Sequence, residues 1–591
     1  MSRSAPDKRR PAAAALAIGT AAALGLLATV AQPAAHAAVV PATAAAGAAV
    51  LAAGPAAAAA LAANQPHHDS AADHTWTEAD VAAVSLTGSG ATTTSPNVTV
   101  SGQTITVTAA GTYRFSGSLT NGQIAVNSPG TGLVRLILNG VTVANSTSSA
   151  VNVIAADEVM VVLQAGSTNR LSDASVYSYP SGVDEPNAAL FSAADTTITG
   201  TGTLTVTGNA YDGIASKDGL YIDSGTITVT AKDDGIRGRD YVYVAGGTIT
   251  ATSAGDGVTA DNDEDTTRGY VYVGAGTVNA TSTAGDAING ETDVIVTGGT
   301  VTAKAGGGST VTPGTASTKG VKAGVLAVIS EGRTTIDASD DGLHSDGGVT
   351  VDGGTTTIAT GDDGVHAETD VRISAGTVTV SRSYEGIEGL KVFLSGGTIS
   401  ATATDDAVNA SDPATGEMQN SPNALISVTG GTVVVSGGTD GLDSNGALAV
   451  GGGTVVVNGS PTRGGGEGGL DANGALTITA GVLLSAGISS STSTLPSSGQ
   501  GWVQVTFSAN QAAGTIVHLA TTSGTQLAAF QSTKAFRSVV FSSAQITRGT
   551  TYAIRTGGAV SGTAVGGGLY TGGTLSGTQV TTVTAGTQTR G

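Results

Sequence analysis

A short phrase of acidic residue, glycine and aliphatic residue recurs through the middle of the chain. In its fullest form it reads Asp340-Asp341-Gly342-Leu343-His344, and it returns 22 residues later as Asp362-Asp363-Gly364-Val365-His366. Further copies contain Asp212, Asp234, Asp256, Glu385, Asp406 and Asp440. A repeat length in the twenties is typical of solenoid proteins, in which each repeat is one structural unit stacked on the next. The chain is therefore expected to wind repeatedly around one axis.

Each repeat contains three short segments with the pattern of β-strands. One precedes the acid, as in Gly225-Thr226-Ile227-Thr228-Val229, and two apolar segments follow it, the second exemplified by Tyr241-Val242-Tyr243-Val244. Polar and apolar residues alternate in these segments, which predicts half-buried strands and no helix. Three strands in 22 residues make one coil of a parallel β-helix. The high glycine content, 88 of 591 residues, suits a turn in every coil better than an ordinary globular core.

The predicted coils occupy only part of the chain. Residues 1–37 have the basic start, apolar stretch and Ala-x-Ala end of a secretory signal, for which a retained membrane anchor is the alternative. Residues 38–74 are rich in alanine and are expected to be a linker. Residues 75–200 are predicted to form an irregular N-terminal β cap with the first coils, 201–490 the regular coils, and 491–591 a small C-terminal β region. We therefore expect an extracellular monomer without membrane contact once the signal is removed.

Charge and cysteine content exclude several classes of function. The net charge is −20 and the chain contains no cysteine. A nucleic-acid partner is not expected, because phosphate binding requires a basic surface. Disulfides and thiolate metal sites are impossible. An acidic polymer could bind only through a bridging cation or a local basic patch.

The repeated acids are candidate calcium ligands. Strands in successive coils lie about 4.8 Å apart, so equivalent acids form a ladder in which like charges repel. Calcium prefers six to eight oxygen ligands, many of them carboxylates. The alternative is that Asp-Gly is simply a favourable turn between two strands. The acids assigned to calcium are Asp233, Asp234, Asp256, Asp340, Asp341, Asp362 and Asp363 in the coils, and Asp261, Asp263 and Asp265 in a polar loop.

A second row of side chains lies two residues after each glycine position of the phrase. It consists of Arg237, Thr259, Asn289, Lys322, His344, His366, Glu388, Asn409, Asp443 and Asp471. Alternation places these residues toward solvent if their apolar neighbours point inward. Such a mixed polar row suits sugar hydroxyls, whereas an ordinary solvated face is the alternative. For His344 and His366, one coil apart, a transition-metal site is a further alternative.

Aromatic residues supply a possible platform for sugar rings. Tyr241 and Tyr243 occupy the strand equivalent to that of Tyr270 and Tyr272, so one of each pair is expected to face outward and the other to fill the core. The candidate carbohydrate-binding residues are Lys217, Arg237, Tyr243, Tyr272, His344 and His366.

Several phrases, in chain order, resemble a known family. They are Val107–Tyr113, Leu136–Gly140, Gly213–Asp218, Asp234–Asp240 and Arg548–Ile554. Together they are similar to the secreted bacterial carbohydrate-binding β-helix family, whose clostridial representative binds cellulose and polygalacturonate. The resemblance implies a right-handed parallel β-helix like that of calcium-dependent pectate lyases, with bound calcium and polysaccharide binding. This chain departs from the pattern where Lys319 and Gly468 replace the ladder acid.

The predicted function is calcium-dependent binding of plant cell-wall-type polysaccharide, cellulose or polygalacturonate, without turnover. No catalytic residue is assigned. A pectate-type lyase is the first alternative, and Lys217, Lys232, Arg237 and Lys322 are its candidate bases, although no spacing singles one out. A structural surface adhesin is the second alternative.

Overall fold

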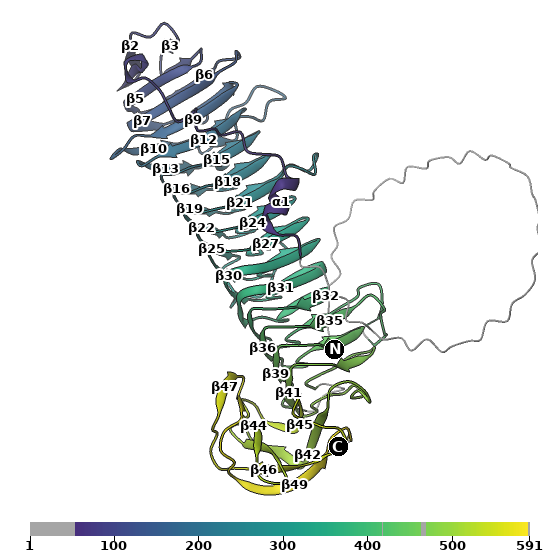
Figure 1. Cartoon of the computed structure of the whole chain (residues 1–591). Helices are drawn as coiled ribbons and strands as arrows, with labels where there is room; N and C mark the ends of the chain where they lie inside the picture. Colours follow the sequence, from purple (N-terminus) through teal and green to yellow (C-terminus); the bar gives the residue numbers. More distant parts are fainter. Residues whose placement is uncertain (1–53, 417, 463–467, 589–591) are drawn as a thin grey trace, which may run out of the picture. The chain divides into compact units, whose positions relative to one another are not determined.

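Parallel strands dominate the computed structural model, which describes residues 54–416, 418–462 and 468–588. In the regular part, each strand pairs in parallel with the strand three places further along the chain. The chain thus passes through three stacks of strands in turn, and successive coils follow one another in chain order (Figure 1). This all-β architecture of long parallel stacks is the one expected of a parallel β-helix.

We call the stacks first, second and third. In each regular coil the chain passes through the first stack before the ladder acid, and through the second and then the third stack after it. The first stack contains β1 (Ala82–Gly88), β5 (Gly111–Leu119), β7 (Leu133–Ala144), β10 (Thr168–Ser172), β13 (Thr203–Gly208), β16 (Thr226–Ala231), β19 (Thr248–Ser253), β22 (Thr277–Ser282), β25 (Thr300–Ala305), β28 (Arg333–Ala338), β30 (Gly348–Thr360), β31 (Val365–Arg382), β33 (Thr398–Thr402), β36 (Thr432–Ser436), β39 (Thr454–Asn458) and β41 (Val482–Gly487).

The second stack contains the short strands that follow the acids. These are β4 (Thr104–Val107), β6 (Gln123–Asn127), β8 (Val151–Ala155), β11 (Ala188–Ser192), β14 (Asp212–Ser216), β17 (Ile236–Gly238), β20 (Val258–Ala260), β23 (Ile288–Gly290), β26 (Val321–Ala323), β29 (Leu343–Ser345), part of β31, β32 (Ile387–Leu394), β34 (Asn409–Ala410) and β37 (Asp443–Ser444).

The third stack completes each coil. It contains part of β7, β9 (Glu158–Leu163), β12 (Asp195–Gly200), β15 (Gly219–Ile222), β18 (Tyr241–Val244), β21 (Tyr270–Val273), β24 (Asp293–Val296), β27 (Leu326–Ile329), parts of β30, β31 and β32, β35 (Leu425–Val428), β38 (Ala447–Val450) and β40 (Leu476–Ile478). The long strands β30, β31 and β32 continue around corners and so belong to more than one stack.

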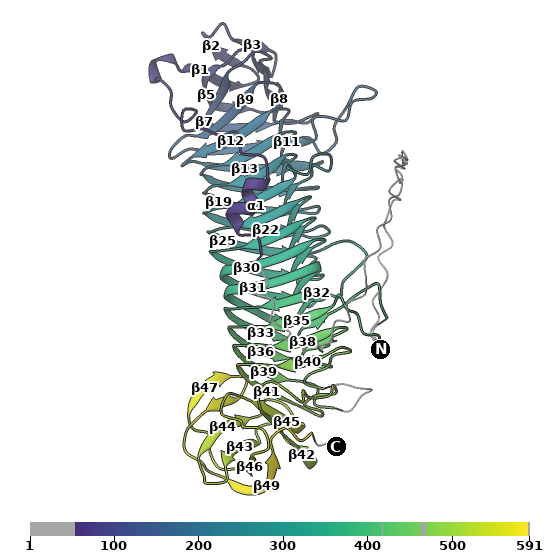
Figure 2. The ribbon, with the colours of Figure 1, turned by 45° about the vertical axis from the view of Figure 1, so that its right-hand side comes forward.

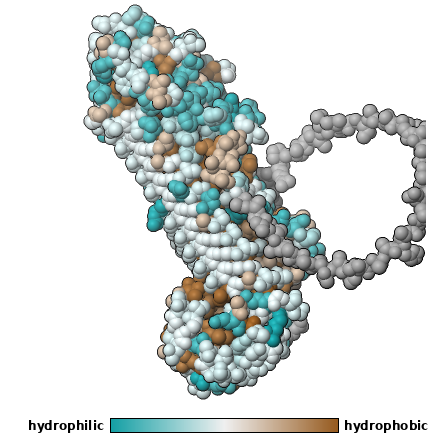
Figure 3. Space-filling model, viewed as in Figure 1, coloured by the Kyte–Doolittle hydropathy of each residue, from teal (hydrophilic) through white to brown (hydrophobic). Residues whose placement is uncertain are grey.

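One continuous apolar core runs through the coils. Ile227 and Val229 of β16, Ile236 of β17, and Val242 and Val244 of β18 are all completely buried in it. The residues between them point outward, because side chains alternate along a strand. In the first stack these outward residues are mainly threonines, and on the face seen in Figure 3 the coils are largely pale, with hydropathies near the middle of the scale.

A glycine before each first-stack segment from β19 onward explains the Gly-Thr phrase of the repeat. Gly299 has φ +72, which side chains rarely tolerate, and a Cβ there would lie 2.7 Å from the carbonyl oxygen of Gly276 in the preceding coil. The equivalent glycines all have φ between 65 and 88: Gly247, Gly276, Gly299, Gly332, Gly354, Gly376, Gly397, Gly431, Gly453 and Gly481. The corner therefore requires glycine both for its backbone angle and for the close approach of neighbouring coils.

The N-terminal strap, residues 54–80, runs along the outside of the third stack. Its helix α1 (Ala57–Ala63) buries Ala57 and Ala60 against Ile295 and Val328, and Figure 2 shows α1 against the outside of the coils. The strap continues past β21, β18 and β12, and its 3₁₀ turn η1 (Glu78–Asp80) pairs with Arg114 of β5. Part of the range 38–74, assigned to a linker from its composition, is thus packed on the coils. No helix in the described ranges is long and apolar enough to cross a membrane, and the predicted signal, residues 1–37, lies outside these ranges.

Both ends of the stacks carry antiparallel strands. At the start, β2 (Ala91–Thr93) pairs with β1, and β3 (Val98–Ser101) with β4. At the other end, β45 (Phe536–Ser542) lies antiparallel to both β41 and β42 (Trp502–Gln511). A separate antiparallel sheet contains β43 (Ile516–Thr521), β44 (Gln526–Gln531), β46 (Thr551–Thr556), β47 (Thr563–Gly566), β48 (Leu569–Thr571) and β49 (Thr578–Thr584).

Replacing a corner glycine should destabilise the coils. We expect Gly299→Ala to lower the free energy of unfolding by about 1–3 kcal/mol, since it adds backbone strain and a steric clash. Urea unfolding followed by circular dichroism measures this. Gly314→Ala is the matched control, because Gly314 lacks a positive φ and a Cβ there meets open space. Equal losses in the two variants would contradict the role assigned to the corner.

Candidate functional site

The ladder acids hold neighbouring coils together through one carboxylate oxygen each. Oδ1 of Asp234 accepts the backbone N–H of Asp256 at 2.7 Å, and Oδ1 of Asp256 accepts that of Asp286 at 2.8 Å. The same bond joins Asp212 to Asp234, Asp286 to Lys319, Asp341 to Asp363, Asp363 to Glu385, Asp406 to Asp440, and Asp440 to Gly468. A buried N–H must find an acceptor, and at this corner the carboxylate provides it. The acid of the Asp-Gly phrase therefore has a structural role between coils, through one of its two oxygens, and not in the local, positive-φ turn that the alternative described, because Gly235, Gly257 and Gly342 have no positive φ.

The second carboxylate oxygen usually faces the polar row that was predicted two residues after the glycine position. Oδ2 of Asp256 accepts from Asn289 at 2.9 Å, and Oδ2 of Asp212 pairs with Arg237 at 2.8 Å. The row forms in the expected register, each member opposite the next from Arg237 through Asp443.

The prediction that this row faces solvent was wrong for several members. Thr259 is 2%, His344 7% and Asn409 8% exposed. Each of them lies between row members of the two adjacent coils, and His344 and Asn409 turn back to hydrogen-bond the ladder carboxylates. The Nδ1 atom of His344 and the amide nitrogen of Asn409 are thereby occupied within the protein.

Asp233 and Asp234 are brought together, whereas the two carboxylate oxygens of Asp256 accept hydrogen bonds from Asp286 and Asn289 of the next coil. Oδ1 atoms of Asp233 and Asp234 both lie within 3 Å of the place that a Cβ on Gly255 would take, so this glycine leaves room where the two carboxylates converge. Burial, with the charges of Asp212, Asp256 and Asp233, raises the pKa of Asp234 to about 8. No ion pair to Asp234 occurs among the described residues. An all-oxygen site with excess negative charge is the kind that calcium occupies.

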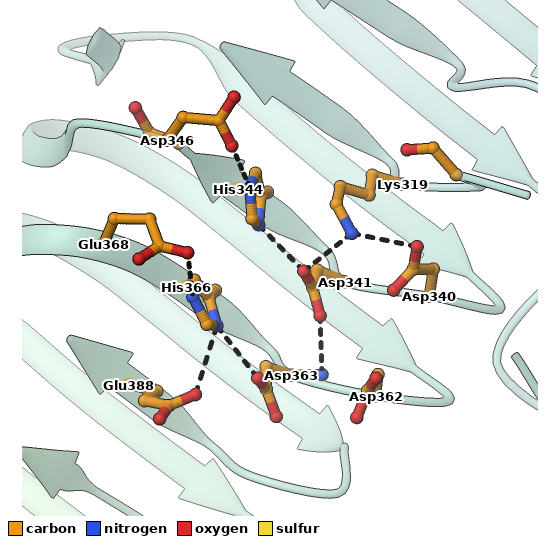
Figure 4. A network of polar contacts seen from close by, with 12 residues as sticks. Lys319, Asp340, Asp341, His344, Asp346, Asp362, Asp363, His366, Glu368 and Glu388 are labelled. Carbon is orange, nitrogen blue, oxygen red and sulfur yellow. Dashed lines mark hydrogen bonds and ion pairs between the residues drawn. The ribbon is translucent and has the colours of Figure 1, made fainter. Parts of the chain in front are cut away.

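The acids Asp340, Asp341, Asp362 and Asp363 are also brought together, but an ammonium group already lies among them. Lys319 Nζ is 2.9 Å from Asp340 and 3.0 Å from Asp341 (Figure 4). The lysine that interrupts the ladder in the sequence therefore neutralises the acids of the next coil. Burial, followed by the charges of Asp341 and Asp340, raises the pKa of Asp362 to about 6.

The loop acids Asp261, Asp263 and Asp265 are not brought together. Asp261 pairs with Arg237 at 3.4 Å, whereas Asp265 accepts from the backbone N–H of Thr267 at 3.0 Å. Asp263 is exposed. The alternating acids thus serve separate local contacts in this structure.

Two basic candidates for sugar binding are already paired with acids. Lys217 lies 2.8 Å from Glu185, and Arg237 lies between Asp212 and Asp261. Burial opposes ionisation of Arg237, but the Asp212 and Asp261 carboxylates prevail and raise its pKa. These cations are consequently engaged by the protein itself.

Tyr243 and Tyr272 lie on the outer face of the third stack as predicted, stacked on each other with ring centroids 4.2 Å apart. Tyr221 covers the other face of Tyr243 at 5.1 Å, and His67 of the strap lies 4.6 Å from it. The ring faces of Tyr243 are therefore occupied by neighbouring tyrosines.

The expectation that Tyr241 and Tyr270 fill the core was wrong. Residues two apart in a strand point to the same side, so both tyrosines also face outward while the intervening valines enter the core. They are buried because the strap covers them: Tyr241 Oη accepts the N–H of His68 at 2.8 Å, and Tyr270 donates to the Gln65 carbonyl at 2.8 Å. The strap was not predicted from the sequence, in which the adjacent His67 and His68 were the available signal.

A further acidic group was recognised in the repeat but not assigned a role. Burial and the charge of Asp443 raise the pKa of Asp406 to about 8, and burial and the charge of Asp406 raise that of Asp440 to about 9. Asn409, in register with Asp443, has a buried amide oxygen without a hydrogen-bond partner.

Comparison with known proteins gives three matches. The family profile described as "carbohydrate-binding domain-containing protein" matches residues 101–364 and 362–504, about two thirds of the chain. A protein of that description from Acetivibrio thermocellus is 37% identical over 135 residues, which are 23% of this chain and 47% of that protein, so the match spans about half of the relative. The solved structure of a polysaccharide lyase-like protein from C. thermocellum, a gadolinium derivative, is 26% identical with a TM-score of 0.34, covering 50% of this chain and 96% of that one.

The acids Asp406 and Asp440 should make the chelator-treated protein less stable as the pH rises. A carboxyl whose pKa is raised on folding stabilises the fold while protonated, and this contribution is lost as the pH rises through about 8 for Asp406 and about 9 for Asp440. We expect the free energy of unfolding, measured in urea between about pH 6 and 9, to fall by up to about 1.4 kcal/mol per pH unit for each proton released. Asp440→Asn keeps an acceptor for Gly468 and should flatten this dependence. An unchanged slope in the variant would refute the assignment.

Proposed function

The chain belongs to the family of carbohydrate-binding domain-containing proteins, and we propose that it is a secreted, calcium-stabilised protein that binds plant cell-wall-type polysaccharide without turning it over. The resemblance found in the sequence is confirmed by the family match over residues 101–504. Cellulose and polygalacturonate are the proposed ligands. We also take the coils to form a closed, right-handed parallel β-helix, since parallel crossovers are right-handed in nearly all proteins.

The observation that carries the proposal is the register of the polar row. Hydrogen-bonding side chains from Arg237 to Asp443 stand one coil apart on the outer side of the second stack. Several of them, including Asn289, Lys322 and Glu388, are partly exposed. A row with a spacing of about 4.8 Å offers a repeating polymer one set of contacts after another. Sugar hydroxyls are suited to such mixed donors and acceptors.

Calcium is proposed to bind at Asp233, Asp234 and Asp256. When bound, the ion would supply the positive charge that these carboxylates lack. It would also provide the bridge to a uronate, because Lys217 and Arg237 are engaged by protein carboxylates. Binding of polygalacturonate is therefore proposed to depend on calcium, and binding of uncharged cellulose much less so.

Absence of turnover is proposed from the state of two of the four candidate bases, Lys217 and Arg237. A lyase needs an unprotonated base next to the uronate carboxylate. Arg237 is held protonated between Asp212 and Asp261, and Lys217 is paired with Glu185. Neither is arranged to accept a proton.

Affinity electrophoresis in gels containing polygalacturonate tests the proposal. We expect retardation with calcium, and about tenfold weaker retention after chelation or in Asp234→Asn, which keeps the hydrogen-bond acceptor but loses a charged ligand. Glu331→Gln removes an equal charge from an exposed residue outside the ladder and should behave like wild type.

Other outcomes identify the alternatives. Unsaturated products that absorb in the near ultraviolet, formed from pectate with calcium, would show a lyase. Failure of any plant cell-wall glycan to retard the protein would indicate a structural adhesin.

A further inference from the structure

The close-up of the ladder shows two stacked imidazoles whose inner nitrogens face carboxylates. His344 of β29 and His366 of β31 lie opposite each other in adjacent coils, with ring centroids 5.0 Å apart and planes inclined by 22° (Figure 4). His344 Nδ1 is 2.8 Å from Asp341 Oδ2. His366 Nδ1 is 3.0 Å from Asp363 Oδ2 and 3.1 Å from Glu388 Oε2. Two nitrogens and three oxygens from three successive coils thus converge.

We propose that Asp341, His344, Asp363, His366 and Glu388 form a site for a divalent transition-metal ion of the zinc class. This site is distinct from the proposed calcium site and does not depend on the proposed glycan binding. Donor atoms of Asp341, His344 and His366 all lie within 4.8 Å of one another, as do those of Asp363, His366 and Glu388. His366 belongs to both groups, so one ion beside its Nδ1 reaches ligands of either group.

The spacing of the donors is close to that of a zinc coordination sphere. Tetrahedral ligands at 2.0–2.1 Å from zinc are about 3.3 Å apart. The three nitrogen–oxygen pairs here are 2.8 to 3.1 Å apart, a few tenths of an ångström short of that distance, and the donors of each group lie within 4.8 Å of one another, so the remaining ligands would have to move closer together around an ion. A single Nδ1 proton on His366 cannot be donated fully to both Asp363 and Glu388, whereas an ion can contact both carboxylates.

The outer nitrogens of both imidazoles support the same assignment. His344 Nε2 is 3.0 Å from Asp346, and His366 Nε2 is 4.0 Å from Glu368. Metal-bound histidines characteristically donate their other ring N–H to a carboxylate, which fixes the tautomer and the ring orientation. Here His344 is placed to make this hydrogen bond to Asp346, whereas Glu368, at the equivalent position two residues after His366, lies only at ion-pair distance.

The donor set also selects the type of ion. Calcium and magnesium prefer oxygen ligands alone, whereas imidazole with carboxylate suits zinc, copper, nickel and iron. Lys319 contacts Asp340 and the same Asp341 oxygen, Oδ2, that His344 faces (Figure 4). Asp363 and Glu388 instead meet at His366 Nδ1, so the ion is expected nearest to this imidazole.

Zinc titration of the chelator-treated full chain, followed by calorimetry and elemental analysis, tests the site. We expect one zinc ion per chain, and at least about 100-fold weaker binding in the double variant His344→Asn/His366→Asn, since both nitrogen ligands are lost. His74→Asn is the matched control: His74 is also paired with a carboxylate, Asp69 at 3.0 Å, but lies in the strap. It should bind zinc as wild type does.

X-ray absorption of the zinc-loaded wild-type protein provides a readout that does not depend on whether the double variant folds. We expect scattering from two imidazoles, and retention of zinc in an excess of calcium. Absence of stoichiometric binding, equal affinity in the double variant, a spectrum without imidazole scattering, or displacement of zinc by calcium would each overturn the proposal.

Discussion

The structure depends on the parallel hydrogen-bonded register that places each residue of a coil directly beside its equivalent in the next. Strands about 4.8 Å apart repeat every side chain at that distance, which is favourable for valine in the core and costly for carboxylates. The acids are tolerated because Oδ1 of each accepts a backbone N–H from the following coil, as in the bond from Asp256 to Asp234. The acids thus satisfy backbone N–H groups at this corner but repel one another. A cation near the second carboxylate oxygen reduces that repulsion.

The sequence was sufficient to predict this register to the residue. Because the repeat length sets the pairing of parallel strands, the row from Arg237 to Asp443 could be written down before any coordinates, and His344 does lie opposite His366. The exposure of that row could not be predicted in the same way. It depends on side chains such as His344 and Asn409 folding back onto the ladder, a choice of rotamer that periodicity does not determine.

The strap shows a second limit of reasoning from repeats. Asn64 donates to Asp293, 229 residues away, and nothing periodic connects the two. The segment is rich in alanine, which favours a helix when an apolar surface is available to cover, and Ile295 and Val328 of the third stack provide that surface. Composition alone suggested a linker because it describes the segment and not its partner. The misplacement of Tyr241 was of another kind, since the two-residue period itself required both tyrosines of that strand to face outward.

Some ladder acids lie beside a cationic side chain of the protein, and others do not. Around Asp341 the chain supplies the Lys319 ammonium, whereas Asp234 and Asp440 face mainly other acids and have strongly raised pKa values. These residues therefore do not favour a uniform set of calcium sites along the coils. With the strap covering the third stack from β12 to β27, polar groups in register meet solvent on the threonine-rich first stack and at the partly exposed members of the polar row. Ion binding and glycan binding thus involve the same corner of the coil, so that an ion bound there alters the charge that a polysaccharide encounters.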